Sequence, residues 1–215
     1  IADVNAIDFG TSTIAAGGTL TVTAGDEITQ TGAITAPSLR LIGSGFATLT
    51  NVANNVDNLA AGFSGGDLEF VNDDDFAVAV VGGTSGVTIG ANDVTLQSVN
   101  GTITELSNIN ASSSSLALTT GTTLVLPQMN IAGPQTYTAS TVSGDGITLN
   151  GNVTSTEAGA ITFNSAVTLG ADLTVQSTDS AIDFLGTVAG DSNQLAVNAG
   201  TGIVSFQDAV GGLGS

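Results

Sequence analysis

The 215-residue sequence contains no cysteine, no histidine, no lysine and no tryptophan, and Arg40 is its only basic residue. Without cysteine the chain forms no disulfide and performs no thiol chemistry, and without histidine it lacks the usual base of a serine hydrolase. Nineteen acidic residues against one base give a formal net charge of −18. Because such a surface does not neutralise phosphates, nucleic acid is excluded as a partner.

Charged residues of both signs are also scarce, at 9% of the chain against roughly a quarter in ordinary soluble domains. Ser, Thr, Asn and Gly must therefore cover most of the surface. Residues that favour helix surfaces are few, whereas Thr, Val and Ile occur throughout and glycine occurs 29 times. No apolar run approaches the roughly 18 residues of a spanning helix. The composition predicts an all-β protein that is not membrane-spanning.

Short apolar strands recur along the chain at a nearly constant interval. The segment ITF at 161–163 is followed by IDF at 182–184 and by VSF at 204–206, with VTL at 167–169 and LTV at 173–175 between the first two. Most of these segments carry a polar residue between two apolar ones, the period of a strand with one buried face. The sequence predicts a right-handed parallel β-helix, or β-solenoid, with three short strands per turn of about 21–22 residues.

This repeat also predicts which side chains stack on one another. Phe163, Phe184 and Phe206 should form an aromatic column inside the coils at a spacing of about 4.8 Å, while Asp183 points outward. Glycine and asparagine at the corners, as at 150–152 and 198–200, should supply the positive φ angles that sharp bends require.

The same spacing extends over the whole chain, so we expect residues 1–215 to form a single β-solenoid segment of about ten turns. The expected inward anchors upstream are Ile7, Ile28, Leu49, Phe70, Val125, Ile131 and Tyr137. Two intervals depart from the repeat, which predicts an irregular insertion near 71–90 and a shortened turn near 147–160. The L-x-x-L-x-L-x-x-N pattern of leucine-rich repeats is missing from this sequence, and an antiparallel sandwich is the rival fold. The chain starts in strand-like alternation without a signal peptide, as expected for a segment of a longer precursor.

Four stretches resemble a known family: DEITQTGAITAPSLRL (26–41), ATLTNVANNVDNLAA (47–61), GDLEFVNDDDFAV (66–78) and VTLQSVNGTITE (94–105). The chain is similar here to filamentous-haemagglutinin-type exoproteins, very large bacterial surface or secreted adhesins whose shafts are β-helices. The resemblance implies an extracellular or cell-surface location. The family's N-terminal secretion domain and an Arg-Gly-Asp receptor motif are both missing from this sequence, so neither an export route nor a receptor follows.

The densest acidic cluster, Asp73, Asp74 and Asp75, is the one candidate for a Ca²⁺ site, because that ion prefers oxygen ligands. The alternative is a solvated loop where the repeat is interrupted. The glycine-rich repeat of Ca²⁺-binding β-rolls is absent. We therefore predict no catalytic residue and no cofactor, with Ca²⁺ as the single candidate ligand.

Two other classes of function are weighed against a structural role. A polysaccharide-acting enzyme would need a carboxylate pair, and Asp67 with Glu69, or Asp183 with its neighbours in the stack, are the candidates. An ice- or surface-binding solenoid would need a column of outward threonines, which Thr148 and Thr162 would begin. A single arginine, a single tyrosine (Tyr137) and the lack of tryptophan argue against a polysaccharide groove, and Asp183 interrupts the threonine column.

The sequence thus predicts a structural or adhesive shaft segment of a secreted or cell-surface bacterial exoprotein, not an enzyme. The expected partners are neighbouring solenoid segments or copies of the chain stacked end to end into a filament. A host receptor, a cell-surface receptor or a glycan is the other expected partner.

Overall fold

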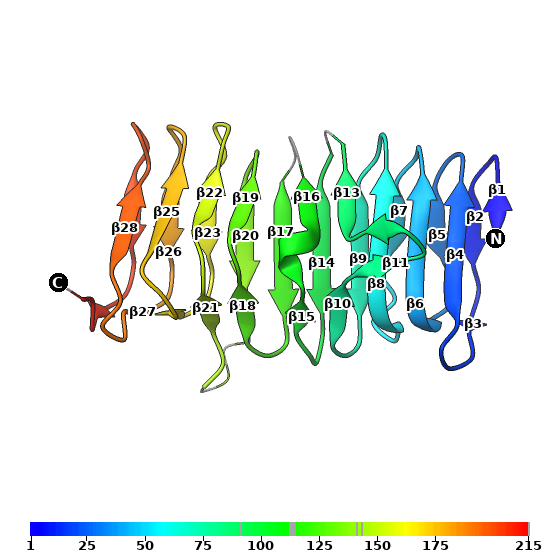
Figure 1. Ribbon diagram of the computed structural model, residues 1–215, viewed down its shortest axis with the longest axis horizontal. Coiled ribbons are helices and arrows are strands. Elements are labelled where there is room, and N and C mark those ends of the chain that lie inside the picture. Colours follow the sequence, from blue (N-terminus) through cyan, green and yellow to red (C-terminus); the bar gives the residue numbers. More distant parts are fainter. Residues whose placement is uncertain (91, 112–114, 141, 143, 215) are drawn as a thin grey trace. The chain divides into compact units, whose positions relative to one another are not determined.

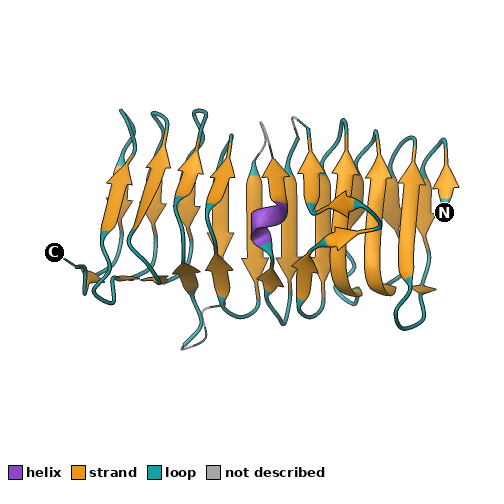
Figure 2. Ribbon diagram, in the orientation of Figure 1, coloured by secondary structure: helices purple, strands orange, loops and turns teal. Residues whose placement is uncertain are grey.

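The computed structural model describes residues 1–90, 92–111, 115–140, 142 and 144–214, and nearly all of its regular structure is short β-strand (Figure 2). Almost all strand pairs are parallel, and they stack as a β-solenoid of about nine turns. The predicted all-β parallel solenoid is therefore confirmed. The chain divides into two compact units, Ile1–Ser112 and Ser113–Ser215, which are described in turn.

The elements of the first unit, most of which are labelled in Figure 1, are β1 (Ala2–Asp3), β2 (Ile7–Phe9), β3 (Ser12–Thr13), β4 (Thr19–Ala24), β5 (Ile28–Gln30), β6 (Ile34–Gly43), β7 (Ala47–Leu49), β8 (Asn55–Phe63), β9 (Leu68–Asn72), β10 (Phe76–Val78), β11 (Val80–Val81), β12 (Thr84–Ser85), β13 (Val87–Ile89), β14 (Val94–Ser98), β15 (Ile103–Thr104), the 3-10 turn η1 (Leu106–Asn108) and β16 (Ile109–Ala111). One sheet of this unit stacks β2, β5, β7, β9 and β14 in order. A second sheet is built around the long strands β6 and β8, which pair with each other in parallel. Each long strand extends far enough to pair with two separate strands of a neighbouring coil, as β8 does with β10 and β13.

The register within the first unit departs from a constant 21-residue repeat. Ile7 lies beside Ile28 and Leu49 lies beside Phe70, both as expected, but Ile28 lies beside Ala47 instead of Leu49. The expected equivalence of Ile28 and Leu49 is therefore wrong by two positions. Both side chains are still buried, because side chains alternate with a period of two and a shift of two keeps them on the same face.

An antiparallel hairpin lies within the stretch where the sequence indicates an irregular insertion. β11 and β12 pair with each other, Val80 with Ser85 and Val81 with Thr84. The coil that contains this hairpin is longer than its neighbours, since Phe70 lies beside Leu96. Figure 1 shows β11 lying across β8 instead of extending the parallel stack.

The second unit is more regular, and its strands are β17 (Leu116–Thr120), β18 (Leu124–Leu126), β19 (Met129–Ile131), β20 (Gln135–Thr138), β21 (Ile147–Leu149), β22 (Val153–Ser155), β23 (Ile161–Phe163), β24 (Val167–Leu169), β25 (Leu173–Ser177), β26 (Ile182–Phe184), β27 (Val188–Ala189), β28 (Leu195–Asn198), β29 (Val204–Phe206) and β30 (Val210–Gly211). Successive strands fall on three sheets in rotation, so each complete turn has three strands. Ile147 lies beside Val167, and Ile161 lies beside Ile182. The short interval from 147 to 161, which suggested a shortened turn, thus joins two different sheets within one turn.

The predicted aromatic column is confirmed in the second unit. Ring centroids lie 4.8 Å apart between Phe163 and Phe184 and 4.8 Å apart between Phe184 and Phe206, with interplanar angles of 16° and 7°. Tyr137 extends the column at 5.5 Å from Phe163. It stacks there because β20 belongs to the same sheet as β23, with Tyr137 directly beside Phe163.

One expected inward anchor of this unit points the other way. Val125 is 43% exposed, whereas Leu124 and Leu126 on either side of it are fully buried. In a strand of three apolar residues, alternation allows either the middle residue or the two outer ones to face the core. Burying two leucines removes more apolar surface than burying one valine, so the assignment of Val125 to the interior is wrong.

The corner residues serve two purposes, only one of which is positive φ. Gly200 has a φ of 60°, as predicted, and Asp179 adopts 56°. Gly151 does not have a positive φ. A β-carbon on it would lie 2.5 Å from the Gln128 backbone nitrogen of the preceding coil. Glycine is required at that corner because adjacent coils approach too closely for a side chain.

Candidate functional surfaces

The acidic cluster of the first unit contributes hydrogen-bond acceptors to the next coil. A carboxylate oxygen of Asp73 accepts a hydrogen bond from the Asn100 side-chain amide at 2.6 Å, and one of Asp75 accepts from the Thr102 backbone N–H at 2.7 Å. Asp74 accepts from the backbone N–H of Asp75 at 2.9 Å. These carboxylates stabilise the corner between two coils.

The same cluster was the candidate Ca²⁺ site. Over the described ranges, no group of three or more acidic side chains is arranged to hold a metal ion. Asp73 is half-buried, while Asp74 and Asp75 are exposed. Binding of Ca²⁺ by these three residues stays a prediction.

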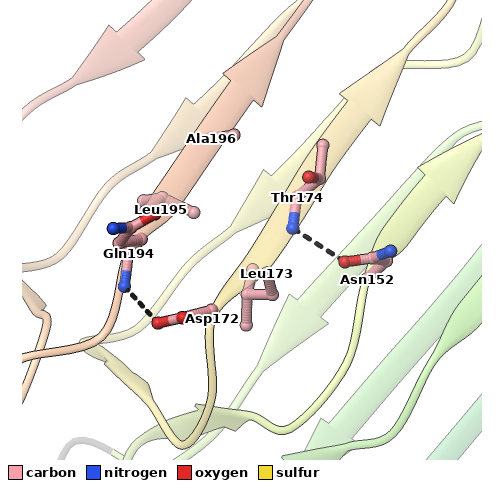
Figure 3. A pocket seen from close by; sticks show the side chains of 7 residues that line it. All are labelled: Asn152, Asp172, Leu173, Thr174, Gln194, Leu195 and Ala196. Atoms are coloured by element: carbon pink, nitrogen blue, oxygen red, sulfur yellow. Dashed lines mark hydrogen bonds between the residues drawn. The ribbon is translucent and has the colours of Figure 1, made fainter. Parts of the chain in front are cut away.

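The corners of the second unit use the same device, shown in Figure 3. The side-chain oxygen of Asn152 accepts a hydrogen bond from the Thr174 backbone N–H at 2.8 Å, and that of Asp172 accepts from the Gln194 backbone N–H at 2.8 Å. The donor and acceptor of each pair lie 22 positions apart, so each bond joins one coil to the next. In further bonds of this kind, the backbone N–H groups of Asp93, Thr102 and Thr201 donate to the carboxylates of Asp67, Asp75 and Asp179, respectively. We call these contacts the corner clamps.

The corner clamps were missed from the sequence, although a signal for them is present. Asn152, Asp172 and Gln194 stand immediately before, or at, the start of three strands of one sheet, β22, β25 and β28. A polar residue directly before successive strands of one sheet indicates a role in joining turns, although the register places Asn152 beside Thr174 and Asp172 beside Gln194. An Asx side chain is suited to it, because its short side chain places an oxygen close to the backbone.

A surface depression of about 300 Å³ lies at these clamps, lined by Asn152, Asp172, Leu173, Thr174, Gln194, Leu195 and Ala196. One oxygen each of Asn152 and Asp172 is already engaged by a backbone N–H (Figure 3). The lining contains one carboxylate and no basic, aromatic or nucleophilic side chain except a threonine hydroxyl. It lacks the convergent acid, base and nucleophile that a hydrolytic site combines.

The carboxylates considered for glycoside cleavage either accept structural hydrogen bonds or have no second carboxylate beside them. Asp67 accepts the backbone N–H of Asp93 at 2.9 Å as a corner clamp, and Glu69 points outward from β9. Asp183 lies between Thr162 and Ser205, so neither adjacent coil places a second carboxylate beside it.

The threonines considered for a surface-binding column lie on different sheets. Thr148 lies beside Val125 and Thr168, whereas Thr162 lies beside Thr136 and Asp183. The expected column that begins with Thr148 and Thr162 is therefore wrong. The pair of Thr148 with Thr168 is flanked by Val125 and Ala189, and the pair of Thr136 with Thr162 is flanked by Ala117 and Asp183.

The single tyrosine is part of the core and not of a reactive site. Tyr137 is fully buried, and its hydroxyl donates a hydrogen bond of 2.5 Å to the side-chain oxygen of Gln135. Burial raises the pKa of the Tyr137 hydroxyl, because the phenolate would be poorly solvated there. The Gln135 amide in turn donates to the Thr154 backbone oxygen at 2.9 Å, so the tyrosine is held by a satisfied internal network.

Comparison with known proteins shows a repeat character for the start of the chain. A family model described as repeats of unknown function (DUF5649) matches residues 1–62, which run from β1 into β8. Comparison with curated proteins and with solved structures gave no match. Within the described residues, no helix is long and apolar enough to cross a membrane. The repeat family and the solenoid agree on a repeating architecture and assign no activity.

Proposed function

We propose that this chain is a shaft segment whose function is structural, namely to extend and to display other parts of the molecule to which it belongs. The stacked interior carries the proposal. From Tyr137 to Phe206 the same inward column and the same parallel backbone pairing recur coil after coil. Buried polar side chains bond to neighbouring backbone, as Ser155 does to the Ala132 carbonyl at 3.0 Å.

The proposal includes a location at the bacterial cell surface or in the extracellular space. The resemblance to filamentous-haemagglutinin-type exoproteins supports it, as does a surface of Thr, Ser and Asn that carries almost no positive charge. Adhesive contacts to a receptor or glycan would then be made by side loops or by other parts of a longer molecule. Further solenoid coils, or copies of this chain stacked end to end in a filament, are the proposed structural partners.

The proposal assigns no catalysis and no resident cofactor to the chain. The chemistry at the depression beside Asp172 supports this assignment, because that lining offers no acid–base pair. It is also supported by Tyr137, whose hydroxyl is enclosed in the core. Ca²⁺ bound at Asp73, Asp74 and Asp75 would have a stabilising role at the corner of one coil.

The experiment is deletion of one complete coil, residues 161–181. Ile182 would then follow Ala160, and Phe184 would take the place of Phe163 beside Tyr137, because the paired residues are in register. A structural shaft should still fold and still present its flanking regions at the cell surface. Deletion of 161–171, which removes an incomplete coil, is the control and should abolish folding of the second unit. Loss of a specific binding or enzymatic activity from the folded coil-deletion variant would contradict the structural role.

A further inference from the structure

The antiparallel hairpin of the first unit is built to lie against the outside of the parallel sheet. β11 and β12 are joined by Gly82 and Gly83, both with positive φ, which is the backbone of a tight hairpin turn. The flanking strands β10 and β13 both pair with β8. The hairpin therefore leaves the coil between two strands that are anchored on β8 and returns to it.

The hairpin covers the outer face of β8. Ala60 lies beside Arg40 and, by alternation, points away from the core, yet it is fully buried. Val81 of β11 is also buried, with 4% of its surface exposed. Gly62 is the next outward residue of β8 after Ala60, and a β-carbon on it would lie 3.8 Å from the Thr84 methyl group. Small side chains on β8 thus leave room for the hairpin to lie flat.

A hydrogen bond extends the contact to one coil further back. The Nε–H of Arg40 on β6 donates to the hydroxyl of Thr84 on β12 at 2.7 Å, and the two residues are 44 positions apart in the chain. The hairpin tip also contacts the Arg40 side chain, because a β-carbon on Gly82 would lie 3.0 Å from its Cδ. β6, β8 and β10 are consecutive in the sheet. The bond therefore joins two coils that are separated by a third.

This contact departs from the usual pattern of solenoids, in which each repeat contacts only its neighbours and stability is a sum of nearest-neighbour terms. We propose that residues 79–86 form a brace that couples three successive coils, and that Arg40 is the residue that fastens it. An isolated two-stranded hairpin is barely stable in water, so its order depends on the docking to Ala60 and Arg40. The brace also couples the local unfolding of β6 and β8 to that of the hairpin, so that these segments open together.

Native-state hydrogen exchange of the 215-residue chain tests the brace. The variants are Arg40→Gln, which removes the guanidinium, and Thr84→Val, which removes the hydroxyl and keeps the shape. Thr48→Val is the matched control, because Thr48 is also a half-buried outward threonine of this unit but does not contact the hairpin. The readout is the exchange rate in peptides that cover 34–43, 76–89 and, as an internal reference, 7–9.

In both Arg40→Gln and Thr84→Val, backbone amides over 76–89 and over 34–43 should exchange roughly tenfold faster than in the wild type. This is the order of change expected when one hydrogen bond to a charged donor is lost. Exchange over 7–9 and exchange in the control variant should keep the wild-type rates. Acceleration confined to 76–89 would show a loose flap and overturn the brace. The brace would also be overturned if the two variants raised the exchange rate equally in all three peptides, or if they raised it in none.

Discussion

Removal of one ring from the aromatic column is the sharpest perturbation of the solenoid core. Phe184 is fully buried and stacks on Phe163 and on Phe206, each at 4.8 Å. Phe184→Ala should therefore destabilise the second unit by about 3–5 kcal/mol, the usual cost of a Phe-to-Ala cavity. We expect the upper part of that range, because two stacked pairs are lost and each contributes about 0.5–1.5 kcal/mol beyond burial.

Two neighbouring substitutions calibrate this value. Phe206 is 41% exposed and stacks on one ring only, so Phe206→Ala in the same 215-residue polypeptide should cost roughly half as much as Phe184→Ala. Asp183 precedes Phe184 and points outward between Thr162 and Ser205. Asp183→Ala should therefore be nearly neutral, within about 0.5 kcal/mol.

The chain offers a built-in probe for the assay. Tyr137 is its only tyrosine, there is no tryptophan, and the ring lies in the same column. Urea unfolding followed by tyrosine fluorescence therefore reports on the second unit, and the shift in midpoint multiplied by the slope gives the change in free energy. Equal destabilisation by Phe184→Ala and Asp183→Ala would refute the inward and outward assignment of the strand.

Three further changes test the corners and the charge. Asp172→Asn keeps the acceptor for the Gln194 N–H and should leave the urea midpoint unchanged, whereas Asp172→Ala should lower stability by about 1 kcal/mol; equal effects would contradict the clamp. Gly151→Ala should prevent close stacking and lower the midpoint strongly, whereas Gly211→Ala, where a β-carbon meets nothing within 4 Å, should not; circular dichroism compares the two. Because the net charge is −18, raising NaCl from about 10 mM to about 500 mM should raise the thermal midpoint by screening repulsion, and a flat midpoint would contradict this.

The architecture was predictable because burial of one face of each strand produces a regular spacing of apolar residues that can be read in the sequence. In ITF, IDF and VSF the apolar flanks and polar centre identify the buried face, and the spacing identifies the partner one coil away. The aromatic column followed from these two facts alone. The three-strand turn followed as well, since three such strands occur between Ile161 and Ile182.

The register was less predictable because a shift by two residues conserves the alternation. The observed pairing of Ile28 with Ala47 satisfies the same alternation of buried and exposed residues as the expected pairing of Ile28 with Leu49. Val125 was misassigned for a related reason, because a strand of three apolar residues carries no alternation to read. In both cases the outcome depends on packing between coils, which a single strand does not encode.

The corner clamps and the hairpin brace were not foreseen because their polar and surface residues lack the apolar alternation that identifies a partner on another coil, here 22 to 44 positions away. Asp172 and Asp179 look like ordinary solvated acids in the sequence, yet each accepts a backbone N–H of the next coil. The irregular stretch after Phe70 could be located, but nothing in its residues identifies Arg40 as its partner. The contact between Arg40 and Thr84 becomes visible only when the coils are placed beside one another.

Disulfide trapping tests the stacking of coils most directly, because the chain has no cysteine of its own. Thr148 and Thr168 are paired on adjacent parallel strands, which lie about 4.8 Å apart and so within the Cα separation that a disulfide spans. The double variant Thr148→Cys with Thr168→Cys should oxidise to an intramolecular disulfide in the folded chain. The pair Thr148→Cys with Thr162→Cys, whose positions lie on different sheets of one turn, should not. Efficient trapping of the second pair, or failure of the first, would contradict the coil-on-coil register on which the structural role rests.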